Sequence, residues 1–222
     1  MSLIDRLLDL LFPPQCPFCG GTGKGGEDGP CAQCVSADFW VPLEERVSSG
    51  ENVARWVCVG WYRDELRRSV RRFKFQDRPQ YAEAYGRELA RTVRLFLPGT
   101  YDCLAWMPVS KERLAQRGYD QAKLLAEALG QALDKPVLPL LEKRRDNPAQ
   151  SSLAEGRDRW KNVSGVYCAP DPAAVAGRRV LLVDDIRTTG ATLEEGARVL
   201  RAAGAAQVVA AVFCRTPEQK RT

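Results

Sequence analysis

The chain has 222 residues, of which 45% are hydrophobic and 27% are charged, and its formal net charge is +5 at pH 7. This composition allows a substantial core and fits one α/β domain with a small appendage. No apolar run is long enough to span a membrane, and residues 1–14 lack the basic leader of a signal peptide, so we expect a cytoplasmic protein. The excess of positive charge suits phosphates or nucleic acid as ligands, although many solvated surfaces are equally basic.

The amino-terminal segment combines a helical pattern with a cysteine cluster. Residues 3–12 carry apolar side chains at helical spacing, which predicts an amphipathic helix that packs on the next module, with a membrane surface as the alternative. Two CxxC pairs follow, Cys16 with Cys19 and Cys31 with Cys34. In a reducing compartment this spacing predicts a structural zinc ion held by four thiolates, with a redox dithiol or a disulfide as the alternative. The intervening segment has no apolar residue, so metal binding would supply the local folding energy.

The absence of histidine limits the possible metal ligands and general bases, and the other cysteines have a separate explanation. The chain contains no histidine, so a zinc site must be all-cysteine and a general base must be another residue. The remaining cysteines lie singly in apolar stretches and predict small buried hydrophobic side chains. They are Cys58, Cys103, Cys168 and Cys214.

A basic helix is predicted after a strand over residues 53–62. Residues 64–75 place Leu66, Val70 and Phe73 on one helical face. The charged residues around the rest of this helix are Arg67, Arg68, Arg71, Arg72 and Lys74. A solvated outer face explains them without a ligand. The alternative is single-stranded nucleic acid, which binds arginine and aromatic side chains by phosphate contacts and stacking.

Helices and apolar strands alternate through the rest of the chain. The predicted elements are helix 80–97, strand 103–109, a loop, helix 121–133, strand 137–141, a polar stretch, strand 178–185, helix 193–204 and strand 207–213. This alternation predicts a parallel sheet that is covered on both faces. Ligands of such sheets bind at the carboxyl ends of the strands.

The stretch "VLLVDDIRTTGAT", residues 180–192, lies at one of these strand ends. A helix is expected to begin near Thr192, so backbone amides and the positive end of the helix dipole face the preceding turn. The small and hydroxyl residues of a phosphate cradle are Thr188, Thr189, Gly190, Ala191 and Thr192. Asp184 and Asp185 are placed to accept hydrogen bonds from vicinal sugar hydroxyls. Helix capping is the alternative, but it requires only one such residue.

This stretch resembles the signature of the phosphoribosyltransferases, and the chain is similar to their ComF-like, competence-associated branch. The segments that carry the resemblance are the four-cysteine module, "FKF" after the basic helix, "MPVSKERLAQRGYDQAKLLA", "QSSLAEGRDRWKNVSGVY" and the acidic motif. The resemblance implies a type I phosphoribosyltransferase-like parallel sheet flanked by helices, over residues 51–222. It also implies a small zinc-ribbon-like module over residues 1–50.

The resemblance also implies roles for individual residues. Asp184 and Asp185 would hold the ribose 2- and 3-hydroxyls of phosphoribosyl diphosphate and would be the catalytic pair, and residues 188–192 would hold the 5-phosphate. The residues expected near the diphosphate are Ser110, Lys111, Arg113 and Arg117. Magnesium is expected with the ligand, because it binds substrate phosphates and keeps water ligands.

Two segments differ from the family pattern. Asp120 stands where relatives usually carry asparagine, which places a carboxylate near the expected site. Residues 150–162 form a long polar connection that predicts a basic lid over a bound anion, with a solvated loop as the alternative. The basic residues of this region are Lys143, Arg144, Arg145, Arg157, Arg159 and Lys161.

The resemblance therefore implies an enzyme that binds phosphoribosyl diphosphate with magnesium. It would transfer the phosphoribosyl group to an unidentified acceptor and release diphosphate, in a competence or DNA-metabolism context. The alternative is a nucleic-acid-binding factor of DNA uptake or transformation that uses the same site for sensing. Its expected partners are single-stranded DNA and proteins of the DNA-uptake machinery.

Overall fold

The computed structural model describes residues 15–21, 29–144 and 165–217. Two predicted features fall outside this part of the chain, namely the amphipathic helix over residues 3–12 and the lid over residues 150–162. The lid residues Arg145, Arg157, Arg159 and Lys161 fall outside it as well.

The core of the molecule is a five-stranded sheet with the strand order β1-β2-β7-β6-β3. These strands are β1 (Val47–Ser48), β2 (Trp56–Trp61), β7 (Gln207–Arg215), β6 (Arg179–Arg187) and β3 (Cys103–Trp106). The short edge strand β1 is antiparallel to β2, and the other neighbours are parallel. The predicted parallel sheet is confirmed, and its carboxyl ends meet along one edge.

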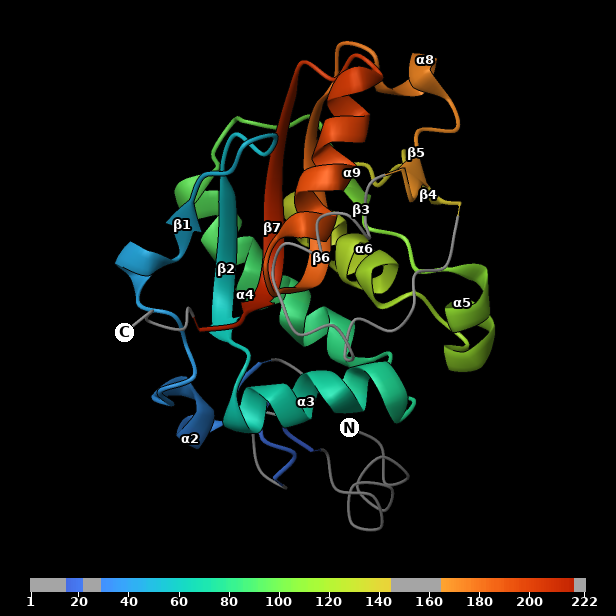
Figure 1. The fold of residues 1–222 in the computed structure, drawn as a ribbon. Coiled ribbons are helices and arrows are strands. Elements are labelled where there is room, and N and C mark those ends of the chain that lie inside the picture. Colours follow the sequence, from blue (N-terminus) through green and yellow to red (C-terminus); the bar gives the residue numbers. More distant parts are fainter. Residues whose placement is uncertain (1–14, 22–28, 145–164, 218–222) are drawn as a thin grey trace, which may run out of the picture.

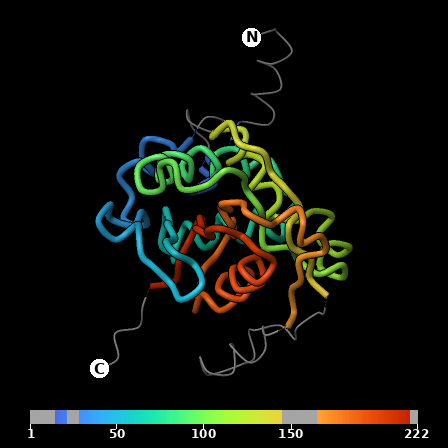
Figure 2. The backbone as a smooth tube through the Cα atoms, turned by 90° about the horizontal axis from the view of Figure 1, so that it is seen from above, coloured from blue at the N-terminus to red at the C-terminus, as the bar shows by residue number. Residues whose placement is uncertain are grey.

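Helices cover both faces of the sheet, as the alternating pattern predicts (Figures 1 and 2). The helices α4 (Tyr81–Phe96) and α6 (Gln121–Leu133) pack on one face, and α9 (Ala191–Ala202) packs on the other. Each face has its own cluster of buried side chains. The basic helix α3 (Asp64–Phe75) follows β2 and lies across the lower end of the sheet in Figure 1.

Short elements complete the described chain. They are α2 (Ala32–Val35), the 3-10 helix η1 (Leu43–Glu45), α5 (Lys111–Arg117), β4 (Glu142–Lys143), β5 (Tyr167–Cys168) and α8 (Pro172–Val175). The strands β4 and β5 pair with each other in a separate antiparallel sheet. No helix in the described ranges has both the length and the apolar character needed to cross a bilayer.

Three predictions about local structure need correction. The predicted strand over residues 137–141 is wrong: it makes one isolated bridge, between Val137 and Leu104, and Pro139 has no N–H to continue a ladder. The strand predicted to end at residue 185 continues to Arg187, so the acidic pair lies two residues before the end of β6. The predicted loop before α6 contains the helix α5, which the Ser110 hydroxyl caps by accepting a hydrogen bond from the Arg113 amide at 3.3 Å.

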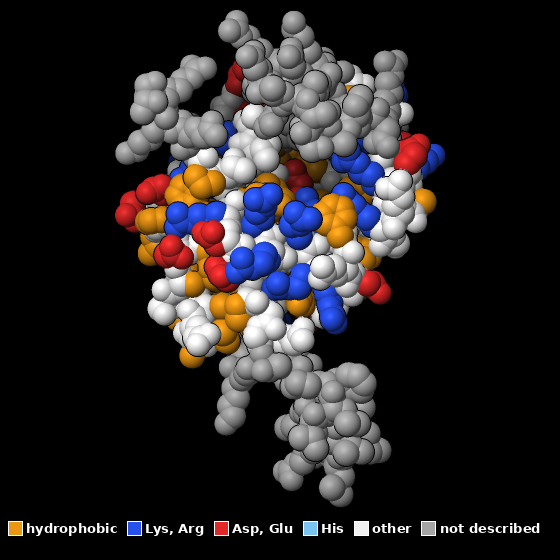
Figure 3. Space-filling model, turned by 60° about the horizontal axis from the view of Figure 1, so that its bottom comes forward, with side chains coloured by type: hydrophobic (Ala, Val, Ile, Leu, Met, Phe, Trp, Pro, Cys, Tyr) orange, Lys and Arg blue, Asp and Glu red, His pale blue; other side chains and the backbone are white. Residues whose placement is uncertain are grey.

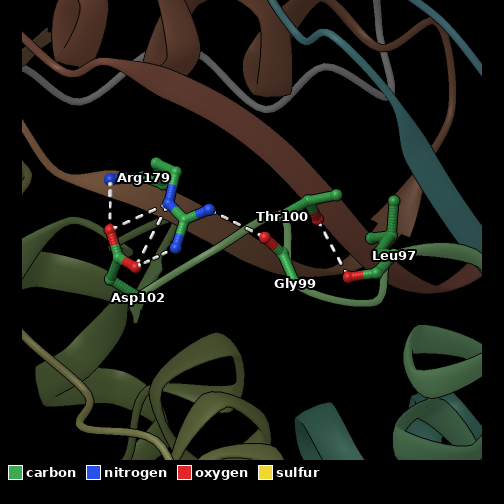
Figure 4. Close-up of polar contacts among 5 residues, drawn as sticks. All are labelled: Leu97, Gly99, Thr100, Asp102 and Arg179. Atoms are coloured by element: carbon green, nitrogen blue, oxygen red, sulfur yellow. Dashed lines mark hydrogen bonds and ion pairs between the residues drawn. The ribbon is translucent and has the colours of Figure 1, made fainter.

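An ion pair joins the amino-terminal ends of β3 and β6, at the edge opposite the predicted site (Figure 4). Asp102 accepts hydrogen bonds from the backbone amide and the guanidinium of Arg179, and Arg179 also donates to the Gly99 carbonyl at 2.8 Å. These hydrogen bonds lower the pKa of Asp102 to about 2. The pair links the starts of the two strands, whose register begins with Cys103 opposite Val180.

Candidate functional site

The acidic pair lies near the carboxyl end of β6. Asp184 is opposite Val212 of β7 in the sheet, and the Asp185 amide donates a hydrogen bond to a carboxylate oxygen of Asp184 at 2.8 Å. Asp185 is only 8% exposed, and Asp184 is partly buried. Burial, and then the charge of Asp185, raise the pKa of Asp184 well above its usual range. Two adjacent carboxylates therefore cost stability here, which favours a functional reason for their presence.

Lys74 enters this site from α3. Its ammonium nitrogen lies 2.8 Å from a carboxylate oxygen of Asp185, and the two side chains are 18% and 11% exposed. The sequence pattern groups Lys74 with the arginines of the basic helix and does not predict this contact. The signal was present, because Lys74 follows the buried Val70 by four residues and so lies beside the apolar stripe of the helix.

The predicted phosphate cradle is the turn between β6 and α9. Gly190 has a φ of 85° and is the N-cap of α9, which begins at Ala191. Thr216 holds the turn by donating a hydroxyl hydrogen bond to the Thr188 carbonyl at 3.4 Å. The guanidinium of Arg187 stacks on Trp56, 4.2 Å from the ring centroid, and lies so close to Gly190 that a Cβ there would approach it to 2.7 Å. The turn thus offers amides at a helix start with a fixed cation beside them.

The four residues expected near the diphosphate occupy different positions. Arg113 and Arg117 line the cavity beside the acidic pair, whereas Lys111 is exposed on the first turn of α5. Ser110 is only 3% exposed, and its hydroxyl caps α5. The Arg117 guanidinium donates to Gln121 at 2.8 Å and stacks over the Phe75 ring at 4.8 Å.

Asp120, the departure from the family pattern, has a structural role. One carboxylate oxygen accepts a hydrogen bond from the Lys123 amide and the other from the Val109 amide, each at 3.1 Å. The side chain therefore caps α6 and ties this helix to the loop after β3. Asparagine also caps helices well, but its amide nitrogen cannot accept a hydrogen bond, so only aspartate can accept from both the Lys123 and the Val109 amides. Burial raises the pKa of Asp120.

These elements enclose one cavity at the carboxyl edge of the sheet. Two carboxylates and four cations converge on it: Asp184, Asp185, Lys74, Arg113, Arg117 and Lys143. Tyr167 of β5 and Thr192 of the cradle also line the cavity. Such a set of groups matches a ligand that carries both hydroxyls and several negative charges.

The four-cysteine cluster satisfies the geometry of a tetrahedral metal site. The sulfur atoms of Cys16, Cys19, Cys31 and Cys34 all lie within 4.8 Å of one another. The Cys16–Cys34 and Cys19–Cys31 sulfur pairs are 3.9 and 3.8 Å apart. A tetrahedron of thiolates around zinc has sulfur–sulfur edges of about 3.8 Å, because each Zn–S bond is about 2.3 Å long. The cysteines are not disulfide-bonded, so all four are available as ligands.

The other cysteines largely behave as predicted. Cys58, Cys103 and Cys214 are completely buried in the apolar core, whereas Cys168 of β5 is only partly buried. Burial raises the pKa of the Cys58 thiol to about 11 and that of the Cys214 thiol well above its usual range. These thiols therefore stay protonated and act as small hydrophobic side chains.

The first cysteine pair packs directly on α3. The Ser69 hydroxyl donates to the Pro17 carbonyl, and the Arg72 guanidinium donates to the Phe18 carbonyl at 3.3 Å. The Phe18 ring lies 5.7 Å from that of Tyr85 in α4 and is completely buried. The cysteine cluster therefore shares a hydrophobic core with the helices beside the cavity.

The basic residues of α3 fall into two groups. Arg67, Arg68 and Arg71 are exposed, and Arg68 is paired with Glu65. Arg72 and Lys74 are partly buried against the cysteine cluster and the acidic pair. Viewed from below, the molecule presents many lysine and arginine side chains together on this face (Figure 3). The exposed Phe75, at 62%, is an aromatic side chain at the end of the same helix.

Comparison with known proteins is consistent with this geometry. Residues 115–222 match the family described as the phosphoribosyl transferase domain. The chain is 33% identical to competence protein F of Haemophilus influenzae, over 86% of this chain and 82% of that protein. It is 29% identical to competence protein ComFC of Bacillus subtilis, over 87% of this chain and 74% of that protein. It is also 29% identical to DNA utilization protein YhgH of Escherichia coli, over 90% of this chain and 84% of that protein.

Proposed function

Because the chain belongs to the ComF-like family of proteins with a phosphoribosyltransferase domain, we propose that its cavity binds 5-phosphoribosyl 1-diphosphate. The bound ligand then transfers its phosphoribosyl group to an acceptor and releases diphosphate. The observation that carries this proposal is the joint lining of one cavity by an acidic pair and four cations.

Each part of the ligand has a matching group in the cavity or in the turn beside it. The amides at the start of α9, with Arg187 beside them, suit the 5-phosphate in the turn over residues 188–192. Asp184 and Asp185 suit the ribose hydroxyls as acceptors. Arg113 and Arg117, which line the same cavity, suit the diphosphate.

The residues present also fit magnesium, because carboxylates at a phosphate site are its usual protein ligands. Asp184 and Asp185 would hold the ion, which neutralises charge on the departing diphosphate when bound.

The proposed reaction is a displacement at the anomeric carbon of the ribose. The bond from this carbon to the diphosphate oxygen breaks, the bond to the acceptor forms, and positive charge develops on the ring between the two events. The carboxylates beside the ring stabilise that charge. The acceptor attacks with an unprotonated atom, so neither carboxylate that would hold the ion also has to take a proton.

Diphosphate release tests the proposal. The protein is incubated with phosphoribosyl diphosphate and magnesium, and then with nucleobases, amines or nucleic-acid ends as acceptors. We expect one class of acceptor to stimulate diphosphate release, and an Asp184→Asn, Asp185→Asn double variant to abolish the stimulation. Release that the double variant supports equally well would refute catalysis at this site.

The exposed face of α3 supports a second function, in which the protein binds single-stranded DNA and uses the cavity for sensing. The relatives are named for competence and DNA utilization. Arg67 and Arg71 are exposed on the same helix as Phe75, which gives phosphate contacts and a stacking surface close together. Partners in a DNA-uptake machinery and a place in competence belong to this proposal.

Salt dependence tests this second function. We expect oligonucleotide binding to weaken as salt rises, and an Arg67→Glu, Arg71→Glu variant to reduce the logarithmic slope by about 1.4, since each phosphate contact on a single strand contributes about 0.7. Arg201→Glu is the control, because Arg201 is exposed on α9, across the sheet. An equal effect of the control would show that only net charge matters.

A further inference from the structure

We propose that Lys74 is a further residue of the ligand site and binds the diphosphate of phosphoribosyl diphosphate. The inference rests on the proposed function. It adds to the ligand site a residue that the pattern of the basic helix does not single out. In the structure its ammonium group is paired with Asp185. We infer that Lys74 exchanges this partner for a diphosphate oxygen when the ligand binds.

The position of Lys74 distinguishes it from the other cations of α3. Its side chain is 18% exposed and lines the cavity, whereas Arg67, Arg68 and Arg71 are exposed to solvent. On the other flank of the helix, Ser69 and Arg72 bind the carbonyls of the first cysteine pair. One side of α3 therefore packs against the cysteine cluster, and the other side places Lys74 in the cavity.

Two contacts place the end of α3 beside the diphosphate wall. The Phe75 ring, one residue after Lys74, lies under the Arg117 guanidinium at 4.8 Å. The Tyr119 hydroxyl donates a hydrogen bond to the Phe73 carbonyl. Residues on both sides of Lys74 are thus attached to the segment that joins α5 and α6. Lys74 lines the same cavity as Arg113 and Arg117, and its ammonium group is paired there with Asp185.

The ion pair also explains how the site would discriminate between ligands. Charges in a partly buried cavity interact more strongly than they do in water, so Asp185 stays paired until another anion attracts Lys74. The diphosphate of the ligand is such an anion. Once Lys74 turns to it, the Asp185 oxygen is free to accept a ribose hydroxyl. Ribose 5-phosphate has no diphosphate, so it leaves the pair in place and uses the cradle alone.

Calorimetry with Lys74→Met tests the inference in the presence of magnesium. We expect the affinity for phosphoribosyl diphosphate to fall about 10- to 100-fold, the usual effect of losing a hydrogen bond to a charged group. Affinity for pyrophosphate should fall similarly, and affinity for ribose 5-phosphate should change less than about twofold. Lys74→Arg should recover part of the loss. Arg68→Met is the matched control, because it removes a cation from the exposed face of the same helix.

The outcomes separate this inference from the proposed function. If the parent binds phosphoribosyl diphosphate and Lys74→Met binds it equally well, the inference is wrong and the proposed function stands. An equal loss for all three ligands would also overturn it, because it would show a structural effect. If Lys74→Met unfolds, Lys74→Gln gives the same test with a polar end near Asp185. If the parent binds no phosphoribosyl diphosphate, the proposed function and this inference both fail.

Discussion

Replacing Gly190 by alanine tests the phosphate cradle through a calculable cost. At a φ of 85° a side chain costs about 1–2 kcal/mol, because this left-handed conformation crowds the Cβ. The new Cβ would also lie 2.7 Å from the Arg187 guanidinium, which must shift and so weakens its contact with Trp56. Losing that cation–π contact costs about 0.5–2 kcal/mol. We therefore expect the free energy of unfolding to fall by about 1.5–4 kcal/mol.

Gly177→Ala is the matched control for this experiment. Its φ is 74° and a Cβ there meets no atom within 4 Å, so only the backbone strain of about 1–2 kcal/mol applies. Urea unfolding followed by tryptophan fluorescence measures both variants, and calorimetry measures their affinity for phosphoribosyl diphosphate. Gly190→Ala should lose more stability than the control, and it alone should lose affinity. Equal destabilisation, with affinity unchanged in both, would refute the proposed role of this turn.

Two further predictions concern the metal and the acidic pair. Purified protein should contain about one zinc ion per chain by metal analysis, and Cys31→Ser should release it; protein prepared without chelator that contains no zinc would contradict this. Removing the metal with a chelator should also weaken binding of phosphoribosyl diphosphate, because Pro17 and Phe18 support the helix that carries Lys74. Because the pKa of Asp184 is raised in the folded protein, ionising this carboxyl destabilises the fold. This cost is absent below the usual pKa of 3.8, and it increases as the pH rises above that value. Asp184→Asn should therefore raise the free energy of unfolding at pH 7 but not near pH 3, and urea unfolding showing no gain at pH 7 would contradict this.

Local patterns predicted the long elements well. The apolar spacing of residues 64–75 and 121–133 gave the bounds of α3 and α6, because both helices bury a continuous stripe. The short α5 was missed since seven residues show little periodicity, although its N-cap Ser110 and its C-cap Gly118 were readable signals.

Tertiary contacts explain what the sequence did not predict. The pattern placed Asp184 and Asp185 at the end of the strand, but pairing with β7 extends β6 two residues beyond them. Local spacing predicts neither the ion pair of Lys74 with Asp185 nor the contact of Phe18 with Tyr85 of α4, because each contact joins segments far apart in the chain. The division of the chain at residue 50 stays a prediction, and β1, before that point, already pairs with β2.

Titration calorimetry with phosphoribosyl diphosphate and magnesium tests the central claim most directly. The cavity is predicted to bind about one ligand per chain. An Asp184→Asn, Asp185→Asn double variant should bind more weakly, because the ribose hydroxyls lose their carboxylate acceptors. Folded parent protein that gives no heat of binding at several temperatures, or a double variant that binds as tightly as the parent, would contradict the claim.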